Sequence, residues 1–177
     1  MKILIKSFII IILSIVSSYS ACDLKAEFGE KKEVFEKREI IGRPFPLEYP
    51  ELEVFPVLAD DICPNQKLKD VGIEYRFLNN ELVAINFVAL NDDRNLVSEK
   101  LLLMNYVKNN YKKFDTGKNP NSYEGVEVIE KTNLFVVYQR ITGEDGIKNE
   151  QIYLSTPELD EKLSKFYAEK EMEMPKN

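Results

Sequence analysis

Hydrophobic and polar positions alternate most regularly in residues 72–90. Apolar side chains occupy every second position from Ile73 to Phe77, the pair Asn79-Asn80 interrupts the pattern, and a second β-rich run follows. Asparagine tolerates positive φ, so we expect a type I′ turn at these asparagines and a register that pairs Tyr75 with Ala84. The second run is apolar on both faces, which is typical of a central strand covered on both sides.

The pattern predicts four more elements after this hairpin. Apolar positions in residues 96–114 recur at helical spacing, and residues 124–141 read as a second hairpin followed by a strand over residues 150–155. Ser155 and Glu158 have capping-box spacing with a proline between them, which predicts the start of a last helix. Its expected buried stripe consists of Leu159, Leu163 and Phe166.

The element order is hairpin, helix, hairpin, strand, helix, which indicates an α+β fold. We expect an antiparallel or mixed β-sheet with helices packed on it, preceded by an irregular Pro-rich segment. The predicted organisation is a signal peptide over residues 1–21, an N-terminal arm and extended strap over 22–71, a core over 72–168 and a charged tail over 169–177. In outline the segment from residue 73 resembles small exported bacterial domains of hairpin-helix-hairpin build. This outline contains no diagnostic motif, so no functional residue follows from it.

Residues 43–57 hold four of the eight prolines together with much apolar surface. Proline lacks a backbone donor, which favours an extended strap and argues against the centre of a sheet. The favoured interpretation is a strap across the core, and the alternative is a surface that binds a partner. For that alternative, the candidate binding residues are Phe45, Tyr49 and Phe55 in the strap and the acidic pair Asp60 and Asp61 beyond it.

The N-terminus has the three parts of a secretory signal peptide. Lys2 and Lys6 form a basic region, residues 8–16 form a short apolar run, and residues 17–21 are small and polar. The apolar run is shorter than the ~20 residues that span a bilayer. Cleavage removes two lysines and changes the net charge from −6 to −8.

The two cysteines, Cys22 and Cys63, allow two interpretations. In an oxidising compartment an even pair predicts a disulfide, which we favour. The alternative is a lipid anchor on Cys22, because Ser20-Ala21 before the cysteine resembles a lipobox. Tyr19 occupies the position where a lipobox has an aliphatic residue, and lipidation would leave Cys63 unpaired.

The composition limits the chemistry. The 177 residues contain no histidine, so neither a Ser-His-Asp arrangement nor a His-ligated zinc site can form. The acidic balance argues against binding to nucleic acid. No phosphate loop, nucleophile motif or Cys-x-x-Cys occurs, and the acid pairs at 60–61, 92–93 and 144–145 lie in loop sequence. We therefore predict no catalytic residues, no metal and no cofactor.

These observations favour a small non-catalytic protein that acts by binding, periplasmic or secreted in a bacterium. The expected partner is a protein or envelope component, for example the target of an inhibitor or immunity-type protein, and the acidic charge favours a basic one. The alternatives are a carrier of small molecules or lipids with an aromatic-lined cavity, and a carboxylate-dependent hydrolase.

Overall fold

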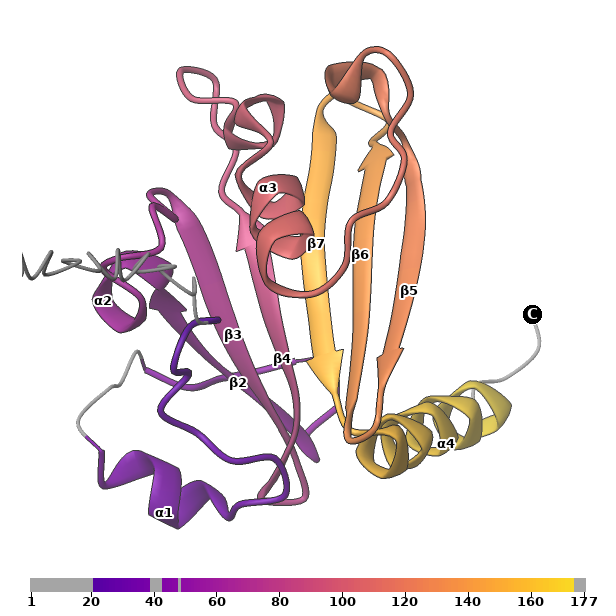
Figure 1. Ribbon diagram of the computed structural model, residues 1–177. Helices are drawn as coiled ribbons and strands as arrows, with labels where there is room; N and C mark the ends of the chain where they lie inside the picture. Colours follow the sequence, from indigo (N-terminus) through magenta and orange to yellow (C-terminus); the bar gives the residue numbers. More distant parts are fainter. Residues whose placement is uncertain (1–20, 39–42, 48, 174–177) are drawn as a thin grey trace, which may run out of the picture.

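The computed structural model describes residues 21–38, 43–47 and 49–173 and shows one sheet of seven antiparallel strands. The strands lie in the order β1-β2-β3-β4-β7-β6-β5, so β4 and β7 join two meanders (Figure 1). The strands are β1 (Phe45–Pro46), β2 (Leu52–Leu58), β3 (Val71–Leu78), β4 (Glu81–Ala89), β5 (Gly125–Lys131), β6 (Leu134–Thr142) and β7 (Lys148–Ser155). The α-helices are α1 (Lys32–Glu36), α2 (Ala59–Ile62), α3 (Leu102–Asn110) and α4 (Pro157–Glu173), with 3₁₀ turns at Val97–Lys100 and Pro120–Ser122. The predicted α+β class is confirmed.

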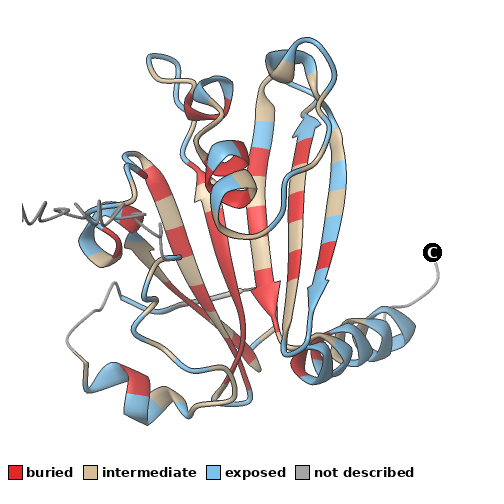
Figure 2. Ribbon diagram, in the orientation of Figure 1, coloured by how far each residue is buried: buried red, intermediate tan, exposed pale blue. Residues whose placement is uncertain are grey.

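Helices cover the sheet on both sides and define two faces. On the face that we call the α3 face, α3 and the N-terminal arm pack on the larger core (Figure 1). On the opposite face, the α4 face, Leu159 and Leu163 of α4 pack against a smaller cluster. That cluster consists of Leu52, Leu78, Val83 and Ala84. Figure 2 shows that the central strands are the most continuously buried. The interpretation of β4 as a central strand covered on both sides is confirmed.

The first hairpin has the predicted turn but a different register. Asn79 and Asn80 both have positive φ, 50° and 65°, as a type I′ turn requires. A β-bulge then places one extra residue, Val83, in β4, so Tyr75 pairs with Ile85 and not with Ala84. The bulge directs Val83 and Ala84 together toward α4, and Ile85 toward the α3 core.

The predicted helix over residues 96–114 is interrupted. Leu101 has a φ of 55°, which ends the first 3₁₀ turn and starts α3 one residue later. The last helix is capped one residue further along than predicted: the Leu159 amide donates to Thr156 Oγ1, while Ser155 Oγ donates to the Val83 carbonyl at 2.6 Å. Ser155 is therefore a tie between β7 and β4.

The sheet begins earlier than the sequence indicated. Residue 72 was expected to begin the regular core, but β2 pairs along its whole length with β3, and β1 adds a short edge strand. Pro56 lies in β2 at a position that β1 does not reach. The backbone N–H that proline lacks is therefore not needed for a hydrogen bond to β1. At the other end of the chain, α4 continues to Glu173 through the expected tail, and Lys170 forms an ion pair with Glu51 at 3.0 Å.

The predicted disulfide is present. Cys22 and Cys63 are bonded, with their Cα atoms 5.4 Å apart. The bond holds the N-terminal arm beside α2, and the Cys22 amide also donates to Tyr106 Oη at 3.0 Å. A disulfide uses the thiol that an acyl chain would require, so Cys22 in this bond has no thiol left to carry a lipid. The predicted signal peptide lies outside the described residues, apart from Ala21. No helix in the described part of the chain has the length and hydropathy to cross a membrane.

Candidate functional site

The structure separates the five candidate binding residues. Phe55 is fully buried in the α3 core beside Phe35 and Phe77, so its side chain cannot meet a partner. Tyr49 packs edge-on against Phe166 and Tyr167 of α4, on the other face of the sheet. The side chain of Phe45 lies outside the described part of the structure. Phe55 therefore cannot belong to a binding surface that these aromatic residues would share. The interpretation of the segment as a structural strap agrees with the positions of Tyr49 and Phe55.

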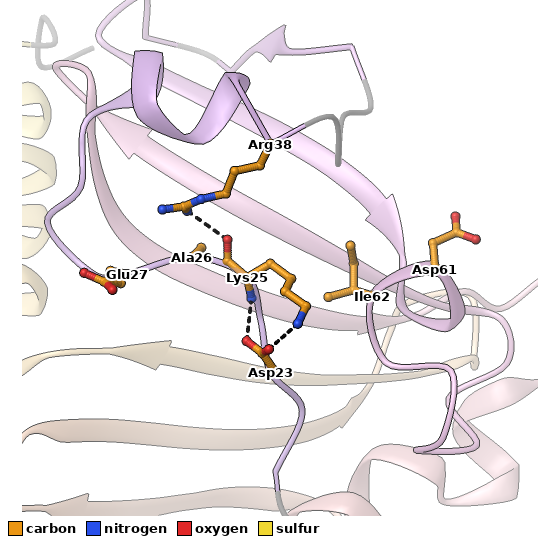
Figure 3. A pocket seen from close by; sticks show the side chains of 7 residues that line it. All are labelled: Asp23, Lys25, Ala26, Glu27, Arg38, Asp61 and Ile62. Carbon is orange, nitrogen blue, oxygen red and sulfur yellow. Dashed lines mark hydrogen bonds and ion pairs between the residues drawn. The ribbon is translucent and has the colours of Figure 1, made fainter.

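Asp60 and Asp61 are exposed in the first turn of α2. Asp61 lines a pocket of about 690 Å³ between the N-terminal arm, the end of α1 and α2 (Figure 3). The other lining residues are Asp23, Lys25, Ala26, Glu27, Arg38 and Ile62. A role in binding for either aspartate stays a prediction.

Charged groups of both signs line this pocket, and its two cations each have an acidic partner. Asp23 forms an ion pair with Lys25, and Arg38 donates to the Lys25 carbonyl at 2.8 Å (Figure 3). Arg38 also forms an ion pair with Glu30. The hydrogen bond from Lys25 lowers the pKa of Asp23, so this carboxylate stays ionised at neutral pH. Beneath the pocket, Tyr75 Oη donates to the Leu24 carbonyl at 2.7 Å. The arrangement fixes the arm to the sheet. Among the described residues, no three acidic or cysteine side chains gather closely enough to hold a metal ion.

A second candidate lies on the α4 face, beyond the area that α4 covers. Strand register places six residues in one row across the sheet, from β2 at one side to β5 at the other. We call this row the open row, and it consists of Leu58, Gly72, Val88, Gln151, Gln139 and Val126. None of these side chains is ionisable, although 31% of the chain is charged.

The open row has apolar ends and an amide centre. Val126 is 53% exposed and Val128, its neighbour on the same face of β5, is 50% exposed. In the middle, Gln151 Nε2 donates to Gln139 Oε1 at 2.9 Å, which pairs the two amides with each other. At the β2 end, a Cβ on Gly72 would lie 3.4 Å from Leu90 Cδ2, so the glycine leaves room for that exposed leucine. Together with Val128, Leu90 and Ile141, the open row forms what we call the open face.

Sequence reasoning did not identify this face. Its six residues come from six strands, and the neighbours β4 and β7 are more than 60 residues apart in the chain. A signal was present in β5, where Glu127 separates Val126 from Val128, but the exposure of the two valines depends on which residues α4 covers.

Sequence reasoning also missed a buried polar cluster on the α3 face. Arg140 is fully buried and opposes Glu150 in the β6-β7 register. Its guanidinium donates to three backbone carbonyls, those of Asn121 at 2.9 Å, Tyr123 at 2.7 Å and Ser98 at 3.2 Å. Arg140 thereby ties both segments that flank α3 to the sheet.

Glu150 holds the start of α3. Its Oε1 accepts from Tyr138 Oη at 2.7 Å and from the Met104 amide at 3.0 Å, in the first turn of the helix. Burial raises the pKa of Glu150, and these donors together with Arg140 oppose the rise. The carboxylate is thus a structural cap inside the core.

Replacement of Glu150 by glutamine is expected to alter the pH dependence of stability. The pKa of Glu150 is raised in the folded state, so the folded protein binds this proton more tightly than the unfolded chain does. The stabilisation that results is fully present below the unfolded pKa of about 4.3, and it declines as pH rises through the pKa of the folded state. The amide cannot ionise, so Glu150→Gln should lose this decline and gain stability relative to the wild type above pH 4.3. Urea unfolding from pH 4 to 8 measures the difference. A constant difference across this range would contradict the prediction.

Comparisons with known proteins assign neither a family nor a function to the chain. No family model and no curated protein matches the chain. Among solved structures, the chain is similar to a cysteine-rich secretory protein from Staphylococcus aureus subsp. aureus Mu50, with 12% sequence identity and a TM-score of 0.34. The similarity covers 79% of this chain, and the chain spans about half, 49%, of the length of that protein. A likeness of this degree assigns no function.

Proposed function

We propose that this chain is a non-catalytic binding protein of the periplasm or the extracellular space, and that it contacts a protein partner through the open face. The observation that carries the proposal is the uncharged open row, which crosses six strands of a strongly acidic chain and is left bare by α4. The centres of protein interfaces are depleted in charged residues and surrounded by polar rims. The disulfide supports an oxidising compartment.

Charge around the open face indicates the chemistry of the partner. Asp60 and Asp61 lie two and three residues after Leu58 in the chain, and neither forms an ion pair with a described residue. Glu130 is exposed on β5 two residues after Val128. The full chain carries a net charge of −6. A partner that fits this surface has an apolar or amide-bearing centre and basic residues at its margin, which would also accelerate association at low salt.

Site-specific photo-crosslinking tests this proposal. A benzophenone side chain placed at Val128 in the producing cell should form an adduct with a second, different protein, and the same group at Val34 should not. Val34 is a matched control, since it is an exposed valine of similar accessibility on α1. With the partner identified and purified, Val128→Lys should raise Kd at least about tenfold, because a charge enters the interface core, while Val34→Lys should leave Kd unchanged.

The association rate should also fall with added salt. Equal adducts at both positions, adducts only between two copies of this chain, or a Kd that Val128→Lys leaves unchanged would each overturn the proposal.

A further inference from the structure

A small crevice lies on the α3 face, opposite the open face, and amide side chains form most of its lining. It has a volume of about 240 Å³ and lies between α3 and the loop that follows the disulfide. From the loop, Asn65, Gln66 and Lys67 line it, and from α3, Leu102, Asn105, Tyr106, Asn109 and Asn110.

Amide side chains dominate this lining. Five of the eight lining residues are asparagine or glutamine, and no carboxylate is among them, in a chain with 30 acidic residues. Lys67 is the one charged side chain in the lining. Each amide offers two N–H donors and one carbonyl acceptor, the same pair of functions that a peptide unit presents. The crevice therefore suits a ligand rich in neutral donors and acceptors, and tolerates an acidic one.

The spacing along α3 favours an extended peptide. Asn105 and Asn109 are four residues apart, so they lie on one face of the helix with an axial separation of about 6.0 Å. Alternate residues of an extended chain repeat about every 6.6 Å. Two asparagines at this interval can thus pair with the backbone N–H and C=O groups of alternate residues of a bound peptide. The side-chain amides of the loop then lie along the other edge of that peptide.

These side chains are available and their supports are rigid. Within the described part of the chain, no residue donates to or accepts from the side-chain amides of Asn65, Asn105 or Asn109. The loop wall is held by the disulfide and by the backbone N–H of Gln66, which donates to the Cys63 carbonyl at 3.0 Å. On the other wall, Tyr106 is buried and its ring stacks on Phe87. A preformed wall on each side reduces the entropy lost on binding.

We propose that this crevice binds an extended peptide segment, uncharged or acidic, through paired amide hydrogen bonds from Asn105 and Asn109 on one side and Asn65 on the other. The inference concerns a different surface from the open face and does not depend on it.

Selection from a random heptapeptide phage library on the intact, disulfide-bonded protein tests the inference. Enriched peptides should be poor in lysine and arginine, and a synthetic copy should shift the side-chain amide signals of the crevice asparagines in ¹⁵N-resolved NMR spectra. The double variant Asn105→Ala, Asn109→Ala should weaken binding of that peptide at least about tenfold. Both residues are exposed, so the fold should persist, which the backbone spectrum checks.

The matched control is Asn133→Ala with Asn149→Ala, two exposed asparagines on other elements, which should leave peptide affinity unchanged. Three results would overturn the inference: no enriched peptide, enriched peptides that bind the Asn105, Asn109 variant as well as the wild type, or shifts of the crevice amides by chitotriose and not by any enriched peptide. The last result would assign the crevice to a carbohydrate. Crosslinking at Val128 is unaffected by any of these results, so the two proposals fail separately.

Discussion

Replacement of Arg140 by methionine is expected to lower the free energy of unfolding by about 3–5 kcal/mol, because it removes several hydrogen bonds from a charged donor, each of which contributes about 1.5–3 kcal/mol. The substitution keeps the volume of the side chain but leaves the carbonyls of Asn121, Tyr123 and Ser98 without their donor. It also removes the positive charge that opposes the raised pKa of Glu150. Urea unfolding followed by circular dichroism at pH 7 measures the loss.

Two further variants show whether geometry or charge carries this effect. Arg140→Lys keeps the charge but cannot span three carbonyls with one planar fork, so its loss should be intermediate. Arg94→Met removes an arginine from an exposed loop position and should change stability by less than about 0.5 kcal/mol. A loss for Arg140→Met as small as that for Arg94→Met would show that the cluster does not stabilise the fold.

Removal of the disulfide by Cys22→Ser with Cys63→Ser is expected to cost about 4 kcal/mol. The bond closes a loop with a sequence separation of 41, and the chain-entropy model assigns a loop of this length a stabilisation of about that size. The arm should also lose its attachment to Tyr106, which would expose part of the α3 core. Denaturant unfolding of the double variant measures the cost.

Reduced wild-type protein provides the comparison, because it loses the bond without any substitution. Its unfolding midpoint should agree with that of the double variant. An oxidised protein whose intact mass shows two free thiols, or an acyl chain, would contradict the disulfide itself.

The short-range features of the fold were predictable from the sequence. The turn at Asn79-Asn80 follows from the conformational tolerance of asparagine, and the second hairpin and β7 follow from local alternation. The register of the first hairpin was not predictable, because the bulge at Val83 is favoured by packing against α4, which lies about 80 residues further along the chain. The break at Leu101 has the same origin, since the start of α3 is held by Glu150 of β7.

β2 was missed for a different reason. Four prolines in residues 43–57 indicate an extended strap. Only the short length of β1 shows that Pro56 has no strand beside it on that side of β2. Among the candidate residues, the cysteine pair was predicted correctly. That prediction required only the number of cysteines and the redox state of the compartment, and both were inferred from the sequence. Phe55 was misassigned because an aromatic side chain in an extended segment gives no sign of the face to which it points.

The order of the strands has a consequence for how this protein is assembled. Strands β1 to β4 and strands β5 to β7 form two meanders of local hairpins, and the strand register that joins them has four residue pairs, from Ile85-Leu154 to Val88-Gln151. Local hairpins form quickly, whereas the pairing of distant strands requires closure of a long loop and is slow. The open row takes Leu58, Gly72 and Val88 from the first meander and the other three residues from the second. Neither half of the nascent chain contains the whole of the proposed binding surface, so the recognition that we propose is restricted to molecules in which this junction has closed.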